Sequence, residues 1–119
     1  MAGARVQAAV IFAGFSFGAA TGLPAACSDL NVHAVISLGT PVQIEGRGYK
    51  YDFLRSCTKA KLFISGARDQ YGPRAELGRL FALASEPKQM VLIEGADHFF
   101  AGRLAELRQA IESWIRQLL

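Results

Sequence analysis

Residues 10–26, VIFAGFSFGAATGLPAA, carry the pattern that decides the fold. The apolar residues 6–13 predict a short buried strand, and residues 17–26 predict the helix that follows it. Between them, residues 14–18 read G-x-S-x-G, which is typical of a nucleophile elbow, a strained turn that presents a serine hydroxyl at the top of a sheet. Such a turn crowds strand and helix together, so we expect added side chains at Gly14 and Gly18 to clash.

Two further strand ends carry residues of matching chemistry. Residues 61–66, KLFISG, predict a strand with Asp69 just past its end. Residues 90–95, MVLIEG, predict another strand, and His98 follows it. Because the carboxyl ends of parallel strands share one edge of a sheet, we expect Ser16, Asp69 and His98 to converge there. A serine activated by a histidine that a carboxylate orients is a nucleophilic triad.

The order serine, acid, histidine is the order of the α/β-hydrolase superfamily, which this chain resembles. It is most similar to the dienelactone-hydrolase-like and small bacterial serine-esterase-like members. The resemblance rests on IFAGFSFGAA, KLFISGARD and VLIEGADHFF, and it covers nearly the whole chain but only the latter part of the family's domain. It implies hydrolysis of a small-molecule carboxylic ester or thioester through an acyl-enzyme, with no metal or organic cofactor. It also implies that the Phe17 backbone N–H is an oxyanion-hole donor, while the usual second donor precedes this chain.

Each of these residues has an alternative interpretation. Ser16 also suits a helix N-cap, and Asp69 also suits a carboxylate that caps the helix near Pro73. Asp97 is the rival for the acid, although a side chain next to His98 is directed elsewhere in most backbone geometries. Two phenylalanines, Phe15 and Phe99, either line the substrate pocket or pack in the core.

Strands alternate with helices, which predicts an α/β fold with a parallel sheet of about four strands. The other predicted elements are a strand over residues 32–38, a loop over 40–51, a helical turn over 52–57, and helices over 73–85 and 102–118. We expect Gly22 and Pro24 to break the first helix early. The length of 119 residues predicts a single, partial hydrolase domain over residues 1–119.

Composition excludes several classes of function. The formal net charge is +3 and the basic residues are scattered, which argues against nucleic-acid binding. The cluster at residues 59–61 is expected to be the solvated start of a strand. Two cysteines and two histidines show no zinc-ligand spacing, and the cysteines predict reduced thiols in a cytoplasmic protein. No apolar run is long enough to span a bilayer, and although residues 1–20 resemble a signal peptide, strand, elbow and helix explain them better.

The first strand creates a problem of assembly. Apolar residues occupy both faces of residues 6–12, and a long apolar edge strand readily pairs with another chain. We therefore expect a homo-oligomer formed through this edge. The alternative function is a catalytically impaired hydrolase remnant that acts as a binding or assembly module, and a third is an acyltransferase.

Overall fold

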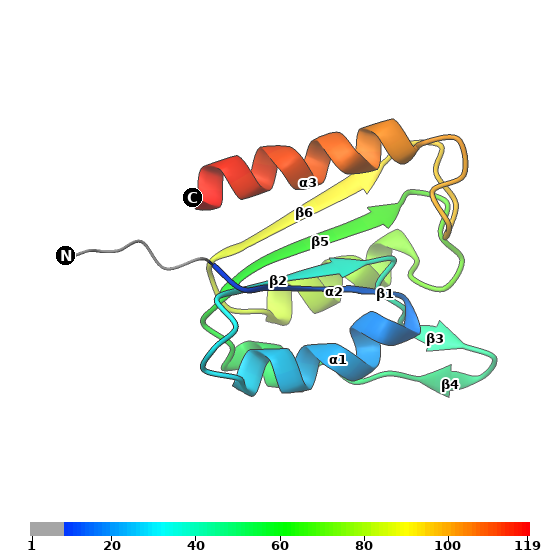
Figure 1. Cartoon of the computed structure of the whole chain (residues 1–119). Helices are drawn as coiled ribbons and strands as arrows, with labels where there is room; N and C mark the ends of the chain where they lie inside the picture. The colour runs from blue at the N-terminus through cyan, green and yellow to red at the C-terminus, as the bar shows by residue number, and fades with distance from the viewer. Residues whose placement is uncertain (1–8) are drawn as a thin grey trace.

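A parallel four-stranded sheet forms the centre of the molecule, as the sequence predicts (Figure 1). The computed structural model describes residues 9–119. The strands lie in the order β1-β2-β5-β6, so that the elbow strand is the outer strand of the described sheet. Their bounds are β1 Ile11–Phe15, β2 Ala34–Leu38, β5 Ala60–Gly66 and β6 Lys88–Ile93.

Helices cover both faces of this sheet (Figure 1). α1 (Phe17–Ser28) and α2 (Arg74–Leu83) place Leu23 and Leu80 in one apolar cluster against β2 and β5. On the other face, α3 (Leu104–Leu118) packs Trp114 into a second cluster. The two clusters explain why β2 and β5 are apolar at nearly every position rather than alternating.

The early break predicted for the first helix is wrong. α1 runs without interruption from Phe17 to Ser28 with Pro24 inside it. The buried side chains Ala19, Leu23 and Ala26 hold one face of the helix on the sheet, and this packing outweighs the local cost of glycine and proline. The next helix also begins close to its predicted position, since α2 follows Pro73 directly.

The segment predicted as a loop over residues 40–51 contains a small hairpin. β3 (Gln43–Ile44) pairs antiparallel with β4 (Arg47–Gly48). Its two-residue turn, Glu45-Gly46, has positive φ at both positions, which matches the right-handed twist of a hairpin. A short 3-10 helix, η1 (Asp52–Arg55), lies where the sequence predicts a helical turn.

Lys61 corrects the expectation of a solvated strand start. Its side chain is fully buried, and its Nζ donates to the carbonyl oxygens of Lys59 (2.7 Å) and Ser85 (2.8 Å). Burial lowers the pKa of this ammonium group, while the nearby thiols oppose the shift. The two carbonyl oxygens therefore stabilise a buried ammonium group that the sequence pattern predicts at the surface.

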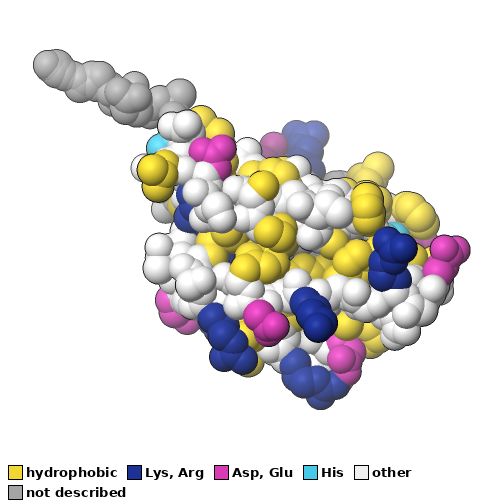
Figure 2. Space-filling model, turned by 90° about the horizontal axis from the view of Figure 1, so that it is seen from below, with side chains coloured by type: hydrophobic (Ala, Val, Ile, Leu, Met, Phe, Trp, Pro, Cys, Tyr) yellow, Lys and Arg dark blue, Asp and Glu magenta, His cyan; other side chains and the backbone are white. Residues whose placement is uncertain are grey.

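The outer strand β1 is only partly covered. The predicted strand begins at residue 6, but residues 6–8 lie outside the described residues. β1 also extends past its predicted end, because Gly14 and Phe15 pair with Ser37 and Leu38 of β2. Figure 2, which views the molecule from the side of α1, shows apolar side chains in the middle of that face and basic and acidic side chains interspersed around them.

Candidate active site

Ser16 occupies the strained turn that the G-x-S-x-G pattern predicts. Its φ of 54° and ψ of −121° are a conformation that residues with a side chain seldom adopt. The Ser16 amide donates to the Leu38 carbonyl (2.8 Å), which ties the turn to β2. The hydroxyl makes no capping hydrogen bond to α1, so the N-cap interpretation does not account for it.

The two glycines of the motif differ. A Cβ added at Gly14 would lie 2.8 Å from the Cα of Ala19, because strand and helix meet there. A Cβ added at Gly18 would meet nothing within 4 Å among the described residues. The predicted crowding therefore holds for Gly14 and is wrong for Gly18, which lies on the exposed side of the first turn of α1.

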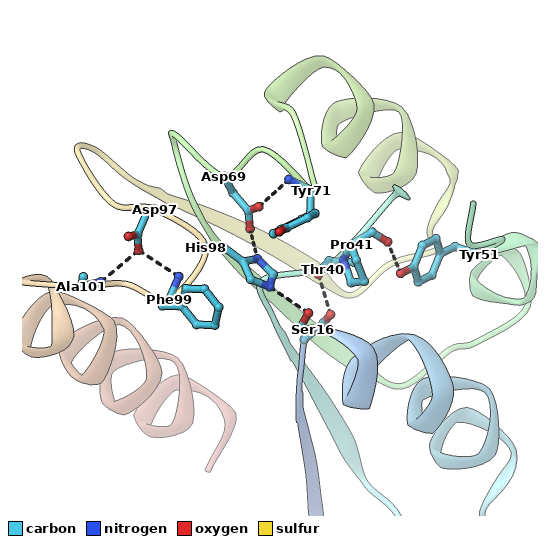
Figure 3. Close-up of polar contacts among 11 residues, drawn as sticks. Ser16, Thr40, Pro41, Tyr51, Asp69, Tyr71, Asp97, His98, Phe99 and Ala101 are labelled. Atoms are coloured by element: carbon cyan, nitrogen blue, oxygen red, sulfur yellow. Dashed lines mark hydrogen bonds and ion pairs between the residues drawn. The ribbon is translucent and has the colours of Figure 1, made fainter. Parts of the chain in front are cut away.

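Ser16, His98 and Asp69 lie in a line of hydrogen bonds (Figure 3). The Ser16 hydroxyl is 2.8 Å from His98 Nε2, and His98 Nδ1 is 2.7 Å from Asp69 Oδ2. The three residues follow β1, β5 and β6, so the parallel sheet brings together groups that are up to 82 positions apart in sequence. The predicted convergence is confirmed as geometry.

Hydrogen bonds fix the orientation of the Asp69 carboxylate. Its side chain is fully buried, with Oδ2 facing the imidazole and Oδ1 accepting the Tyr71 backbone N–H at 2.8 Å. It does not cap α2, since that helix has no side-chain cap. A buried carboxylate that accepts a hydrogen bond at each oxygen cannot rotate freely, and it selects the imidazole tautomer with the proton on Nδ1.

The rival acid, Asp97, is directed elsewhere, as expected. Its Oδ1 accepts the backbone N–H groups of Phe99 (2.9 Å) and Ala101 (3.1 Å). These bonds shape the loop that carries His98, while the carboxylate takes no part in the line of three residues (Figure 3). The other histidine, His33, accepts the Val10 amide at Nδ1 and holds the foot of β1.

Aromatic rings surround the His98 imidazole. The ring centroids of Phe15, Tyr71 and Phe99 lie 5.2, 4.7 and 5.1 Å from that of His98. On a further side, Gly39 has a φ of +58°, and a Cβ there would be 3.3 Å from His98 Cε1. Sequence reasoning missed Gly39 and Tyr71. The position of Gly39 directly after a predicted strand was a usable signal, but nothing in the sequence marks Tyr71.

A second missed glycine, Gly66, positions the loop that carries His98. It ends β5, and a Cβ there would lie 2.3 Å from the carbonyl oxygen of Ala96. The same loops are joined by the Arg68 amide, which donates to Ala96 O at 2.9 Å. The acid loop and the histidine loop can approach this closely only because residue 66 has no side chain.

The oxyanion-hole prediction concerns the Phe17 amide, which lies at the first position of α1. Amides in the first turn of a helix have no intrahelical acceptor, so this N–H is available to a ligand beside Ser16. A rearranged loop over residues 40–47 is a candidate source of a second donor. Two amides of that segment, Val42 and Gln43, already donate to the Tyr71 carbonyl.

Two of the phenylalanines near Ser16, Phe15 and Phe99, are exposed to solvent. Phe99 is 66% exposed and Phe15 is 40% exposed, and their rings lie 6.0 Å apart. Phe17 is also exposed, and its ring meets Tyr49 of the hairpin segment at 6.5 Å. Phe15 and Phe99 are therefore surface residues and not buried core residues.

Residues 9–119 contain neither a metal-binding cluster of side chains nor a membrane-spanning helix. That part of the chain brings no three His, Cys, Asp or Glu side chains together as a metal site would require. None of its helices combines the length and the apolar character needed to cross a bilayer.

A family model described as alpha/beta hydrolase domain matches residues 2–117. The chain belongs to the alpha/beta hydrolase family. Among curated proteins, none matches the sequence significantly.

Solved structures of alpha/beta hydrolases superpose on this chain. An alpha-beta serine hydrolase homologue from Coxiella burnetii is 34% identical with a TM-score of 0.75, and the match covers 95% of this chain and 50% of that one. A putative alpha/beta hydrolase from Agrobacterium tumefaciens is 25% identical, with a TM-score of 0.77 and coverage of 92% and 50%. An a/b serine hydrolase without lid from Xanthomonas campestris is also 25% identical, with a TM-score of 0.73 and coverage of 93% and 48%. The chain therefore spans about half the length of these alpha/beta hydrolases.

Proposed function

We propose that this chain carries the catalytic centre of a serine hydrolase that cleaves a carboxylic ester or thioester through an acyl-enzyme. The single observation that carries the proposal is the unbroken line from Ser16 Oγ to His98 Nε2 and from His98 Nδ1 to Asp69 Oδ2. Membership of the alpha/beta hydrolase family supports it.

In this proposal each of the three residues has a role. His98 Nε2 takes the Ser16 proton as the hydroxyl oxygen attacks the carbonyl carbon, and then returns it to the leaving alcohol or thiol. Asp69 stabilises the imidazolium that forms between these transfers, and it keeps the reactive tautomer in place before them. Water then attacks the acyl-enzyme with His98 again as the base, which releases the acid and restores Ser16.

The tetrahedral oxyanion needs donors aimed at it, and the Phe17 amide is the proposed first donor. Phe15 and Phe99 are the proposed walls for the apolar part of the substrate. The loss of one donor typically costs about a hundred- to a thousandfold in turnover. Since the Val42 and Gln43 amides are committed to Tyr71, we expect slow turnover for this chain by itself.

The hydrogen bonds of the Val42 and Gln43 amides to Tyr71 also favour a second candidate function. A chain with an assembled triad but weak oxyanion stabilisation suits a catalytically impaired hydrolase that acts as a binding or assembly module. The two candidates differ in the reactivity of Ser16, since a module without hydrolytic function does not require an activated serine. An acyltransferase would also have an activated serine, and added alcohol or thiol acceptors would distinguish it from a hydrolase.

A fluorophosphonate probe tests the proposal directly. The phosphorus should become bonded to Ser16 Oγ, as shown by mass spectrometry of the peptide that contains it. Ser16→Ala and His98→Ala should each abolish labelling, because triad members act as a unit. Ser28→Ala is the matched control, since Ser28 lies on the same helix and its hydroxyl donates to the Pro24 carbonyl. Absence of labelling at Ser16 in the folded wild-type chain would refute the hydrolase proposal.

Turnover of a short-chain aryl ester provides the second arm of the test. Asp69→Asn should reduce turnover by about 10⁴-fold, because the amide favours the wrong imidazole tautomer. Asp97→Asn is its control and should change turnover little, since Asp97 faces its own loop. Equal losses in the two variants would contradict the assignment of the acid.

A further inference from the structure

We infer that Tyr71 is a positioning residue of the triad, which fixes the Asp69 carboxylate through its backbone and shields the Asp69–His98 hydrogen bond through its ring. The inference rests on the proposed triad chemistry. Tyr71 contacts both the acid and the base from a single position in the loop between β5 and α2 (Figure 3).

The first contact is made by the backbone. The Tyr71 N–H donates to Asp69 Oδ1 at 2.8 Å, while Asp69 Oδ2 lies 2.7 Å from His98 Nδ1. Both oxygens of one buried carboxylate are therefore held, and the plane of the carboxylate is set. If Oδ1 lost its donor, the carboxylate would be free to rotate about its Cβ–Cγ bond and the imidazole would lose its fixed partner.

The second contact is made by the side chain. The Tyr71 ring meets the His98 imidazole in a T-shaped arrangement, with centroids 4.7 Å apart and planes at 71°. Edge-to-face contacts of this kind favour one ring orientation, so Tyr71 restricts the rotation of the imidazole. The contact with His98 is made by the ring, so the ring is the part of the Tyr71 side chain to which we assign the positioning role.

Residues 40–43, which lead into the β3–β4 hairpin, hold Tyr71 in place. Its carbonyl accepts the amides of Val42 (2.8 Å) and Gln43 (3.2 Å). The next residue, Gly72, lies so close to Thr40 that an added Cβ would be 2.5 Å from the Thr40 carbonyl oxygen. Hydrogen bonds and close packing thus fix the loop that carries Asp69 against the segment that leads into β3, and they keep Tyr71 next to His98.

A water-accessible cleft lies beside Tyr71. It measures about 420 Å³, and Tyr71 lines it together with Gln43, Gln70 and Glu76. The cleft opens to solvent, so water can enter it. Tyr71 lines this cleft and its ring contacts the imidazole, so we expect truncation of the side chain to open the Asp69–His98 pair to water and to weaken their interaction by raising the local dielectric.

Nuclear magnetic resonance of the Nδ1 proton tests the inference without requiring turnover. The chain has two histidines, so ¹⁵N-histidine labelling gives two ring systems, and His33→Gln assigns them. In the wild-type chain, the His98 Nδ1 proton should be visible and protected from exchange with water. Tyr71→Phe keeps the ring and should retain this signal, whereas Tyr71→Ala should broaden it beyond detection through exchange.

Kinetics give the second readout. Tyr71→Ala should slow phosphonylation of Ser16 by about ten- to a hundredfold, which is less than the ~10⁴-fold cost of replacing the triad acid. Tyr71→Phe should stay within about threefold of the wild type, since it preserves both contacts. The turnover number should fall while KM changes little, because Tyr71 acts on the base and not on the bound substrate. Far-ultraviolet circular dichroism and Trp114 fluorescence verify that each variant is folded.

The two proposals fail in different ways. If wild-type Ser16 is not labelled, the hydrolase proposal fails, and the Nδ1 proton still decides the role of Tyr71. If folded Tyr71→Ala keeps a protected Nδ1 proton, or if the wild-type chain shows none, the positioning role is overturned. Should Tyr71→Ala not fold, Tyr71→Thr also removes the ring and leaves the site open to water, and full retention of the protected signal in that variant would equally overturn the role of the ring.

Discussion

Replacement of Gly14 by alanine should destabilise the fold, whereas the same change at Gly18 should not. A Cβ at Gly14 would lie 2.8 Å from Ala19 Cα, 2.9 Å from Ala19 N and 2.9 Å from Phe12 Cζ. Carbon atoms in good contact are about 3.5–4.0 Å apart, so α1 would have to retreat from β1 by roughly 1 Å. Two of the three obstructing atoms are backbone, which cannot rotate away as the end of a side chain can.

The expected size of the effect follows from this geometry. Overpacking of a fitted contact costs about 1–3 kcal/mol in the free energy of unfolding, and the immovable backbone places Gly14→Ala toward the upper end. Gly18→Ala adds a methyl group to open space on a helix, where alanine is favoured over glycine by up to ~1 kcal/mol. The retreat of α1 would also move Ser16, so Gly14→Ala should slow phosphonylation as well.

Urea denaturation measures both variants against the wild type. Trp114, the only tryptophan, reports the packing of α3, and circular dichroism reports the helices. The transition midpoint should fall for Gly14→Ala at an unchanged m-value, and should stay level or rise for Gly18→Ala. Equal stability of Gly14→Ala and the wild type, or equal damage from the two substitutions, would refute the reasoning.

Three further predictions concern other parts of the molecule. Gly39→Ala should destabilise the chain by about 1 kcal/mol or more and should slow phosphonylation, since the new Cβ meets His98 at a position with positive φ; urea denaturation and probe labelling check this. Burial raises the pKa of the Cys27 thiol from about 9 to about 12, and it also raises the pKa of the Tyr51 hydroxyl, which donates to a backbone carbonyl. Above pH 9 these two groups lose their protons more readily in the unfolded chain than in the folded one. Their contribution to the free energy of unfolding should therefore be complete below pH 9 and should fall as the pH rises toward 12, and Tyr51→Phe should make this fall shallower. The lowered pKa of Lys61 has the opposite effect on the free energy of unfolding over this pH range. Finally, we propose that a second copy of the chain covers the outer edge of β1, which pairs with no further strand among residues 9–119, and analytical ultracentrifugation at micromolar concentration should show a dimer; a monomer with that edge uncovered would contradict it.

Much of the fold and the candidate site follows from the sequence because the relevant signals are local. Alternation of short apolar runs with amphipathic stretches predicts a parallel sheet covered by helices, and the structure has both. The positions of Ser16, Asp69 and His98 shortly after three strands predict their convergence, since the parallel sheet places all those strand ends on one edge. In each case a few neighbouring residues carry the information.

Other features depend on contacts between distant segments, and only the tertiary structure decides them. Gly14 and Gly18 are equivalent in the motif, yet Gly14 faces Ala19 and Gly18 faces open space. α1 continues through Pro24 because the sheet holds its buried face, and Lys61 is buried because the carbonyls of Lys59 and Ser85 meet its ammonium group. A local sequence pattern can predict which residues form a turn, but it cannot predict which distant residues will pack against them.

Tyr71 illustrates the same limit at the site itself. Its residue type and its neighbours in sequence are those of an ordinary surface loop. Its position is set by hydrogen bonds from the Val42 and Gln43 amides and by the contact with His98, which lies 27 positions further along the chain. The sequence by itself determined the chemistry available at the edge of the sheet, because reactive groups must follow strand ends to meet there. The tertiary structure decided which residues position those reactive groups, because packing brings together segments that are distant in sequence and whose contacts no local pattern predicts.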